Sequence, residues 1–278
     1  MVRALSPPRL RRPAVAGYYY PEDPQELRGE LDRLLQVSDH SQRMAARGII
    51  IPHGALRQSG AVAGAVVGRI RVPRCCVIIG PSHTGSAMRW SVLARGGYRT
   101  PLGTVAVDEP LCSMLLERCP SLEADPWGQR GEHAIEVVLP FLQSIRPTGL
   151  SLVPVVMNSD RTEDAAELAQ GLAHLIRIHE EPLLLIGSSD LSHYEDAEAG
   201  AEKDRRLIEL IVSLDGPGLL RTVQAGGAMM CGGGPVACVL MAAARLGAIR
   251  GELISYGTSL AAGGDPHSVV GYAGIIVH

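Results

Sequence analysis

The feature that most constrains the fold is a series of short, wholly aliphatic runs that alternate with longer segments of helical pattern. Residues 49–51, 77–79 and 183–186 are such runs, built from Ile, Val and Leu. Runs this short and this apolar are typical of strands that are buried on both faces of a parallel sheet. Alternating strands and helices indicate βαβ units. The sequence therefore predicts an α/β fold with a mostly parallel central sheet covered by helices on both faces.

The same pattern gives approximate bounds for each element. Strands are expected at residues 48–51, 75–79, 90–94, 104–107, 151–157, 183–187, 253–256 and 268–277. Helices are expected at 23–36, 59–70, 109–118, 132–145, 162–178, 197–213, 218–224 and 235–246. Gly60, Gly64 and Gly68 share one face of the helix at 59–70, which predicts close packing of that helix on the sheet. The first dozen residues, with Arg9, Arg11 and Arg12 among prolines, are expected to form a solvated arm.

Composition narrows the class of protein. With 278 residues, of which 46% are hydrophobic, the chain can bury a large core without disulfides. The net charge of −3 argues against a nucleic-acid partner. The six cysteines form no CxxC pair, and no apolar run is long enough to cross a bilayer. We therefore expect a cytoplasmic protein with neither nucleic acid nor membrane as a partner.

Histidines lie just past the carboxyl ends of three of the aliphatic runs. His53 comes after residues 49–51, His83 after 77–79, and His193 after 183–186. Because ligands bind at the carboxyl ends of parallel strands, these side chains are expected to share one site. A neutral imidazole offers one lone pair to a metal, which suits His53 and His83 to that role. Asp190 lies three positions before His193; it would orient an imidazole or accept a proton, or else only form a turn or cap.

Two further segments contain polar candidates for the same site. Cys231 lies in a glycine-rich stretch just before a predicted helix, and is either a small buried hydrophobe or a metal ligand whose thiolate the helix N-terminus favours. Glu132 and His133 open another predicted helix, where Glu132 either complements the helix dipole or faces the same crevice with His133. Residues 232–237 fit the GxGxxG/A pattern, but Pro235 and the lack of a preceding strand count against a dinucleotide site.

Short motifs in a fixed order connect these residues to a known family. They are AGYYYP at 16–21, PH at 52–53, GPSH at 80–83, PLGT at 101–104, EHAIE at 132–136, SDLSHY at 189–194, CG at 231–232, YGTS at 256–259 and SVVGY at 268–272. The ordered set resembles the Memo family, named for a mediator of ErbB2-driven cell motility. Its bacterial and archaeal members are called AmmeMemoRadiSam system protein B. The resemblance extends from residue 14 to near the C-terminus.

The resemblance implies more than the residues alone. It implies a flexible arm at 1–13 and a single three-layer αβα domain at 14–278, similar to class III extradiol dioxygenases, which hold Fe(II) with two histidines and a carboxylate. A cysteine replaces that carboxylate in Memo-like proteins, so His53, His83 and Cys231 become the expected ligands of Fe(II) or copper. His193 matches the acid/base histidine of the dioxygenases, and Asp190 would share its pocket.

These assignments imply redox or oxygenase-type activity on an unknown small molecule. The alternative is a non-catalytic protein that binds a peptide or phosphopeptide in the same crevice, or a scaffold beside radical-SAM and AMMECR1-like partners. One segment departs from the family. After its first histidine the family usually has Ala-Gly-Tyr and then Tyr-Ser-Gly, whereas residues 54–60 here read GALRQSG. The sequence therefore predicts that an aromatic wall beside His53 is missing, and Arg57 points to an anionic partner.

Overall fold

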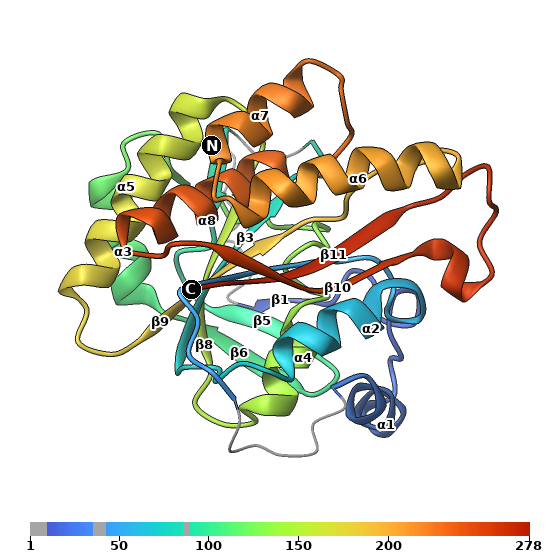
Figure 1. Ribbon diagram of the computed structural model, residues 1–278. Helices are drawn as coiled ribbons and strands as arrows, with labels where there is room; N and C mark the ends of the chain where they lie inside the picture. The colour runs from blue at the N-terminus through green and yellow to red at the C-terminus, as the bar shows by residue number, and fades with distance from the viewer. Residues whose placement is uncertain (1–9, 36–42, 86–88) are drawn as a thin grey trace, which may run out of the picture.

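A sheet of eleven strands runs through the centre of the computed structural model, which describes residues 10–35, 43–85 and 89–278 (Figure 1). Its main path follows the order β1-β5-β6-β8-β3-β9-β2-β11-β10, and β4 and β7 extend it beside β8. The strands are β1 (Leu10–Arg11), β2 (Gly48–Ile51), β3 (Cys75–Pro81), β4 (Trp90–Val92), β5 (Gly97–Thr100), β6 (Gly103–Val107), β7 (Glu123–Ala124), β8 (Ser151–Met157), β9 (Leu183–Ser188), β10 (Gly251–Thr258) and β11 (Gly271–Val277).

The middle of the sheet is parallel. Strands β6, β8, β3, β9 and β2 are successive parallel neighbours, and β11 and β10 continue the sheet in antiparallel fashion. Every residue of β2, β3 and β9 is buried, as their unbroken apolar sequences require. The predicted mixed α/β fold with a mostly parallel sheet is confirmed.

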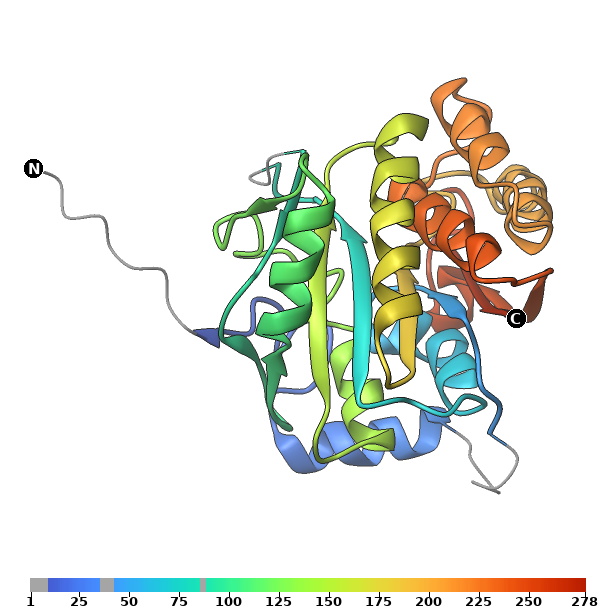
Figure 2. The ribbon, with the colours of Figure 1, turned by 90° about the vertical axis from the view of Figure 1, so that its left-hand side faces the viewer.

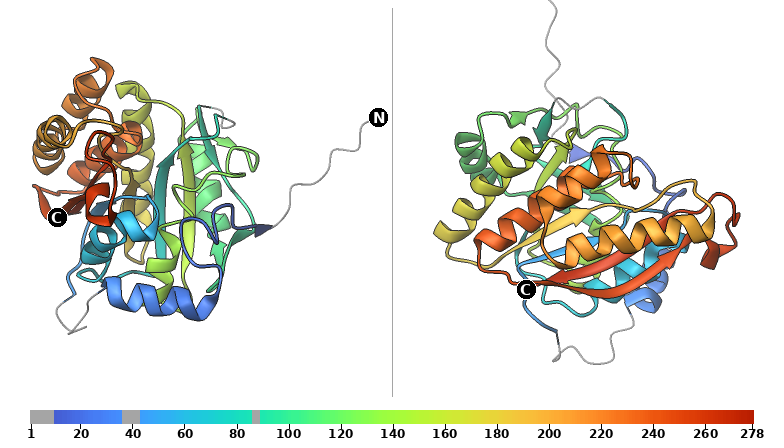
Figure 3. Two further views of the ribbon diagram at one scale, coloured as in Figure 1. Left: turned by 90° about the vertical axis from the view of Figure 1, so that its right-hand side faces the viewer. Right: turned by 45° about the horizontal axis from the view of Figure 1, so that its top comes forward.

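Helices cover both faces of this sheet. Helices α1, α2 and α4 contact one another, and α2 lies on β2, β10 and β11. On the other face α8 lies on β2, β3 and β9, with α5 beside it, while α6 contacts β10 and β11 (Figures 2 and 3). The helices are α1 (Pro24–Leu35), α2 (Leu56–Val67), α3 (Glu109–Arg118), α4 (Leu139–Ile145), α5 (Thr162–Ile178), α6 (Ala197–Val212), α7 (Gly216–Gln224) and α8 (Gly233–Arg245), with a 3-10 turn η2 (Ser259–Ala262).

One helix begins later than the sequence pattern predicts. The pattern predicts a helix over residues 132–145, but α4 starts only at Leu139. A helix from 132 would place Pro140 in its interior, where the ring collides with the carbonyl of Glu136 and no N–H is available. Residues 132–138 therefore form turns, and their polar side chains become free to serve the site described below.

The N-terminal arm also differs from expectation. Residues 1–9 lie outside the described part of the chain, but Leu10 and Arg11 form β1, which pairs with β5. Arg11 is buried; its guanidinium pairs with the carboxylate of Glu136, and its Nε donates to the Gln129 carbonyl at 3.0 Å. A buried guanidinium needs such acceptors. The prediction of a solvated arm is thus wrong for Arg11, while the side chain of Arg12 is exposed.

The glycine face of α2 packs on a helix and not on the sheet. A Cβ atom on Gly64 would lie 2.3 Å from the backbone oxygen of Leu34 in α1, so only glycine permits this approach. This contact fixes α1 against α2, whose first residues lie beside the site. None of the helices in the described ranges has the length and apolarity needed to cross a membrane.

Candidate metal centre

The three strands that end in histidine-bearing loops are neighbours in the sheet. The order β3-β9-β2 brings their carboxyl ends together, so His53, His83 and the loop with Asp190 and His193 meet at one edge. They line a cavity of about 630 Å³. Its wall consists of Tyr18, Tyr19, His53, Gly54, Ala55, Arg57, Gln58, His83, His133, Asp190, His193, Tyr194, Met229, Cys231, Ser259, Gly264, Ser268, Val270 and Tyr272.

His53 is held in one tautomer by a chain of hydrogen bonds. Its Nδ1 lies 2.8 Å from the hydroxyl of Ser188 at the end of β9, and that hydroxyl donates to the Ala134 carbonyl at 2.7 Å. Because the hydroxyl proton is used on the carbonyl, Nδ1 of His53 must be the donor to Ser188. The lone pair of His53 is therefore on Nε2, which faces the cavity side where Cys231 lies.

His83 is oriented in the same manner by a carboxylate. Its Nδ1 lies 2.9 Å from Oε1 of Glu132, and its backbone N–H donates to the other oxygen at 2.5 Å. Glu132 is 1% exposed and also accepts from the backbone of Ala134. A carboxylate behind a ligating histidine fixes the ring and raises its basicity. Nε2 of His83 is thereby left for a ligand.

His133 adds a third imidazole to the cluster. Its ring stacks on that of His83 with centroids 4.4 Å apart, and Tyr19 packs edge-on against it at 4.9 Å. His53, His83 and His133 each offer a nitrogen, and these three atoms lie within 4.8 Å of one another. That spacing fits donors gathered around one small cation, so the histidine cluster could hold a metal ion.

Cys231 approaches the cluster from the loop that precedes α8. Its Sγ lies 3.4 Å from Nε2 of His53 and accepts from the backbone N–H of Asp190 at 3.3 Å. The next residue, Gly232, allows this approach, because a Cβ there would lie 2.6 Å from the Ser188 carbonyl oxygen. Residues 232–237 are thus the turn and first residues of α8 against β9, a packing role for the glycine pattern. Sulfur and imidazole nitrogen together form a soft donor set.

The protonation of Cys231 differs from the sequence expectation. Burial, with the nearby Asp190 carboxylate, raises the pKa of the thiol to about 12. These effects outweigh the influence of the α8 N-terminus, which by itself favours a thiolate. Without a cation the side chain is therefore a neutral thiol. A cation between Sγ and Nε2 of His53 would displace that proton.

Burial also keeps the imidazoles neutral. It lowers the pKa of His53 to about 3, with a further contribution from His83, and the pKa of His133 to about 4, with contributions from His53 and His83. Burial alone would raise the pKa of Glu132, but its hydrogen bond with His83 and the N–H groups around it lower the pKa to about 2. At neutral pH His53 and His133 are therefore neutral nitrogen donors, and Glu132 is an ionised carboxylate beside them.

Asp190 and His193 flank this cluster. Oδ1 of Asp190 accepts from the backbone N–H of His53 at 2.9 Å and of Gly54 at 3.2 Å, so the carboxylate ties the loop after β2 to the loop after β9. Burial raises the pKa of Asp190. His193 uses Nδ1 to donate to the Leu191 carbonyl at 2.7 Å, which leaves Nε2 as its proton-accepting atom.

The aromatic wall is supplied by segments other than the one after His53. Tyr18, Tyr19, Tyr194 and Tyr272 all line the cavity, and a Cβ on Gly54 would lie 3.1 Å from the ring of Tyr272. The segment after His53 contributes no aromatic side chain, as its sequence predicts, and tyrosines from elsewhere in the chain line the cavity instead. Arg57 is exposed in the first turn of α2 and lines the same cavity.

Some members of the site were not found from the sequence. Ser188, the last residue of β9, binds His53, and Ser189, which follows it, binds the backbone of Gly232, but serine at the end of a strand gives no distinctive signal. Glu132 and His133 are candidates from the sequence, but at the start of a helix; the turn before Pro140 is what brings both to His83.

Comparison of the whole chain with known sequences agrees with the ordered motifs. A family model described as Memo-like protein matches residues 11–276. The chain belongs to the Memo family. Its relatives include a MEMO1 family protein of Methanopyrus kandleri, 35% identical over 96% of this chain and 98% of its own. Those of Methanosarcina acetivorans and Aquifex aeolicus are 37% and 34% identical, each over 96% of this chain and 99% of its own.

A solved structure shares the fold with this Memo-family chain. The crystal structure of an uncharacterized protein from Escherichia coli superimposes with a TM-score of 0.55 and 15% sequence identity. The match covers 82% of this chain and 98% of that chain. At this identity the likeness concerns the fold alone, and it agrees with the mixed α/β architecture.

Proposed function

We propose that the cavity at the ends of β2, β3 and β9 binds a single Fe(II) or copper ion through His53, His83 and Cys231, and that the protein acts on a small molecule by redox or oxygenase-type chemistry. The observation that supports this most directly is the fixed tautomer of the two histidines. The Nδ1 of His53 donates a hydrogen bond to Ser188, and the Nδ1 of His83 donates one to Glu132. Nε2 of each ring is thereby left for a ligand. Metal-ligating histidines almost always donate their other ring N–H to a protein acceptor in this way.

The two candidate donor sets share His53 and His83 and differ in the third ligand. The family resemblance favours Cys231, whose Sγ lies 3.4 Å from Nε2 of His53. The spacing of the nitrogens favours His133. A thiolate with two imidazoles selects iron or copper, whereas three imidazoles equally suit zinc. We propose Cys231 as the ligand and His133 as the wall that packs on His83.

Two neighbouring residues would handle protons. A bound iron or copper ion would supply electron transfer and a position for oxygen or substrate. His193 offers Nε2 as a general acid or base. Asp190 accepts from the backbone N–H of His53, and His193 offsets part of the rise that burial causes in the pKa of the Asp190 carboxyl. Asp190 thus positions the metal ligand.

Metal analysis of protein purified without oxygen tests the proposal. After loading with Fe(II) or Cu(I) and dialysis, the wild-type protein is expected to retain about one equivalent. His53→Ala, His83→Ala and Cys231→Ala should each lose it with an unchanged circular dichroism spectrum. His174→Ala, in α5, is the matched control and should retain the metal.

The role of the third ligand is read from absorption. A thiolate–metal charge-transfer band should be present in the wild type and in His133→Ala, and absent in Cys231→Ser. Protein that stays metal-free after loading with both metals contradicts the proposal. The alternatives would then be a non-catalytic protein that binds a peptide or phosphopeptide in the same crevice beside Arg57, or a scaffold beside radical-SAM and AMMECR1-like partners.

A further inference from the structure

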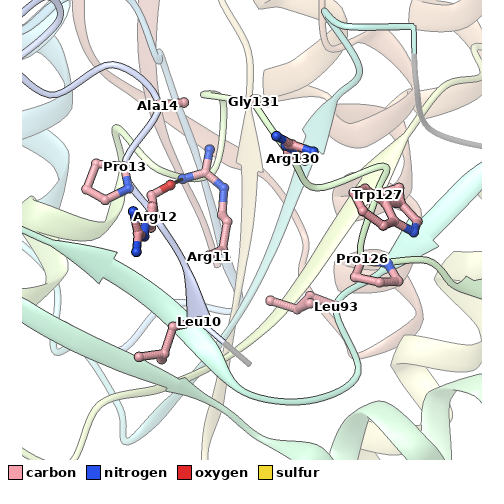
Figure 4. A pocket seen from close by; sticks show the side chains of 10 residues that line it. All are labelled: Leu10, Arg11, Arg12, Pro13, Ala14, Leu93, Pro126, Trp127, Arg130 and Gly131. Atoms are coloured by element: carbon pink, nitrogen blue, oxygen red, sulfur yellow. Dashed lines mark hydrogen bonds between the residues drawn. The ribbon is translucent and has the colours of Figure 1, made fainter. Parts of the chain in front are cut away.

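A second cavity lies on the far side of the loop that includes Glu132. Its volume is about 480 Å³, within the range of pockets that hold small molecules. Figure 4 shows Leu10, Arg12 and Pro13 from the N-terminal segment on one side, and Pro126, Trp127 and Arg130 on the other. Leu93 lies between the two groups, and the remaining wall is made by Arg11, Ala14 and Gly131. We call this the arginine pocket.

The apolar part of the arginine pocket is exposed to solvent. Trp127 is 49% exposed and Leu10 is 43% exposed, so both present apolar surface at this pocket. The turn that presents Trp127 is fixed, because the carboxylate of Asp125 accepts from the backbone N–H groups of Trp127 and Gly128. An indole held outward by its own turn, beside leucine and proline side chains, suits an apolar ligand.

The charged part consists of two arginines, Arg12 and Arg130, that have no acidic partner among the described residues. The guanidinium of Arg11 is satisfied by Glu136 and is not available. Arg12 and Arg130 are exposed, and neither pairs with a carboxylate within residues 10–35, 43–85 and 89–278. Arg130 lies over the ring of Trp127, 5.6 Å from its centroid, so cation and apolar surface form one continuous face. Unpaired guanidinium groups recognise carboxylates well.

The charges also indicate where the occupant comes from. Residues 1–9, which precede the pocket in the chain, read MVRALSPPR and contain two arginines and no acidic residue. Like charges would oppose their binding beside Arg12 and Arg130. The occupant that complements the pocket is therefore an external anion.

We propose that the arginine pocket binds a small amphipathic anion, with an aliphatic or aromatic body against Trp127 and Leu93 and a carboxylate between Arg12 and Arg130. This site is separate from the metal centre and does not depend on it. The ligand class is an organic acid with a single carboxylate and an apolar body, since Arg12 and Arg130 line the cavity together with apolar side chains such as Leu93 and Trp127.

Nuclear magnetic resonance of the full chain with octanoate as the probe tests the proposal. The chain has two tryptophans, of which Trp90 is fully buried and Trp127 half exposed. Octanoate should shift the indole N–H signal of Trp127, assigned by its loss in Trp127→Phe, and leave that of Trp90 in place. Octan-1-ol, which lacks the charge, and acetate, which lacks the body, should each bind at least about tenfold more weakly.

Variants distinguish specific binding at this site from nonspecific hydrophobic binding. Arg12→Gln combined with Arg130→Gln should weaken octanoate binding by at least about tenfold, while the exposed Arg221→Gln in α7 leaves it unchanged. An unchanged Trp90 signal shows that the double variant is folded. Equal binding by the double variant and the wild type, or no shift of Trp127 with octanoate, overturns the proposal.

Discussion

The cavity of the metal centre and the arginine pocket share the loop at residues 126–133, which contributes His133 to the first and Trp127 and Arg130 to the second, and they differ in how their polar groups are held. In the metal centre His53 is buried, and His83, although exposed, has a fixed hydrogen-bond partner in the buried Glu132. In the arginine pocket the cations of Arg12 and Arg130 are exposed and unpaired among the described residues. The first arrangement suits a small cation that has lost its water; the second suits a larger anion that keeps part of its hydration.

The largest expected effect comes from the residue between the two pockets. Arg11→Gln should lower the free energy of unfolding by about 3–5 kcal/mol, because it leaves the buried carboxylate of Glu136 without its cation. Arg12→Gln, one position along and exposed, should leave unfolding unchanged. Urea denaturation of the two variants measures the difference between a buried and an exposed arginine. Equal stability of the two would contradict the structural role of Arg11.

Acid should destabilise the metal-free protein through the buried imidazoles. The pKa values of His53 and His133 are lowered to about 3 and about 4, so between those values and about 6.5 the unfolded chain binds more protons than the folded one. Stability is full above pH 6.5 and falls as the pH decreases. The slope should approach about 1.4 kcal/mol per pH unit for each histidine.

Urea denaturation of chelator-treated protein between pH 4 and 7 measures this slope. This pH range spans the ordinary histidine pKa of about 6.5. His133→Gln should reduce the slope by the contribution of one proton, about 1.4 kcal/mol per pH unit. A slope that is the same in wild type and His133→Gln would show that the imidazole is not neutral and buried in the folded state.

A smaller effect is expected from Glu132→Gln. The amide keeps the shape but loses the charge behind His83, and outer-sphere changes of this kind weaken metal binding by about 10–100-fold. Competition with a chelator of known affinity for Fe(II) measures the change. Octanoate binding to the arginine pocket should not change in this variant, and a parallel loss there would show that the two pockets are one functional unit.

The parts of the site that follow from the sequence are those attached to regular strands. His53, His83, Asp190 and His193 come directly after aliphatic runs, and parallel pairing alone brings such loops to one edge. Cys231 joins them by family resemblance, since nothing in its glycine-rich stretch defines where the sulfur points. The contact with His53 needs the close approach at Gly232, which only the assembled chain reveals.

The parts that were predicted incorrectly depend on side-chain burial that no local pattern contains. Arg11 reads as part of a basic, proline-rich arm, yet its guanidinium is buried against Glu136, more than a hundred residues away along the chain. Glu132 and His133 fit a helical pattern that Pro140 prevents. In both cases a long-range ion pair or a single proline overrides local preference.

The order of strands has a consequence for the chain while it is being synthesised. Strand β2, which leads to His53, lies between β9 and β11, and both of these partners come much later in the sequence. Until the ribosome has passed residue 188, the GIII segment has no strand to pair with, and such unpaired apolar edges favour aggregation. The nascent chain therefore has an extended interval in which a chaperone is useful. Cys231 emerges later still, so a metal ion can meet the complete donor set only after most of the sheet has formed.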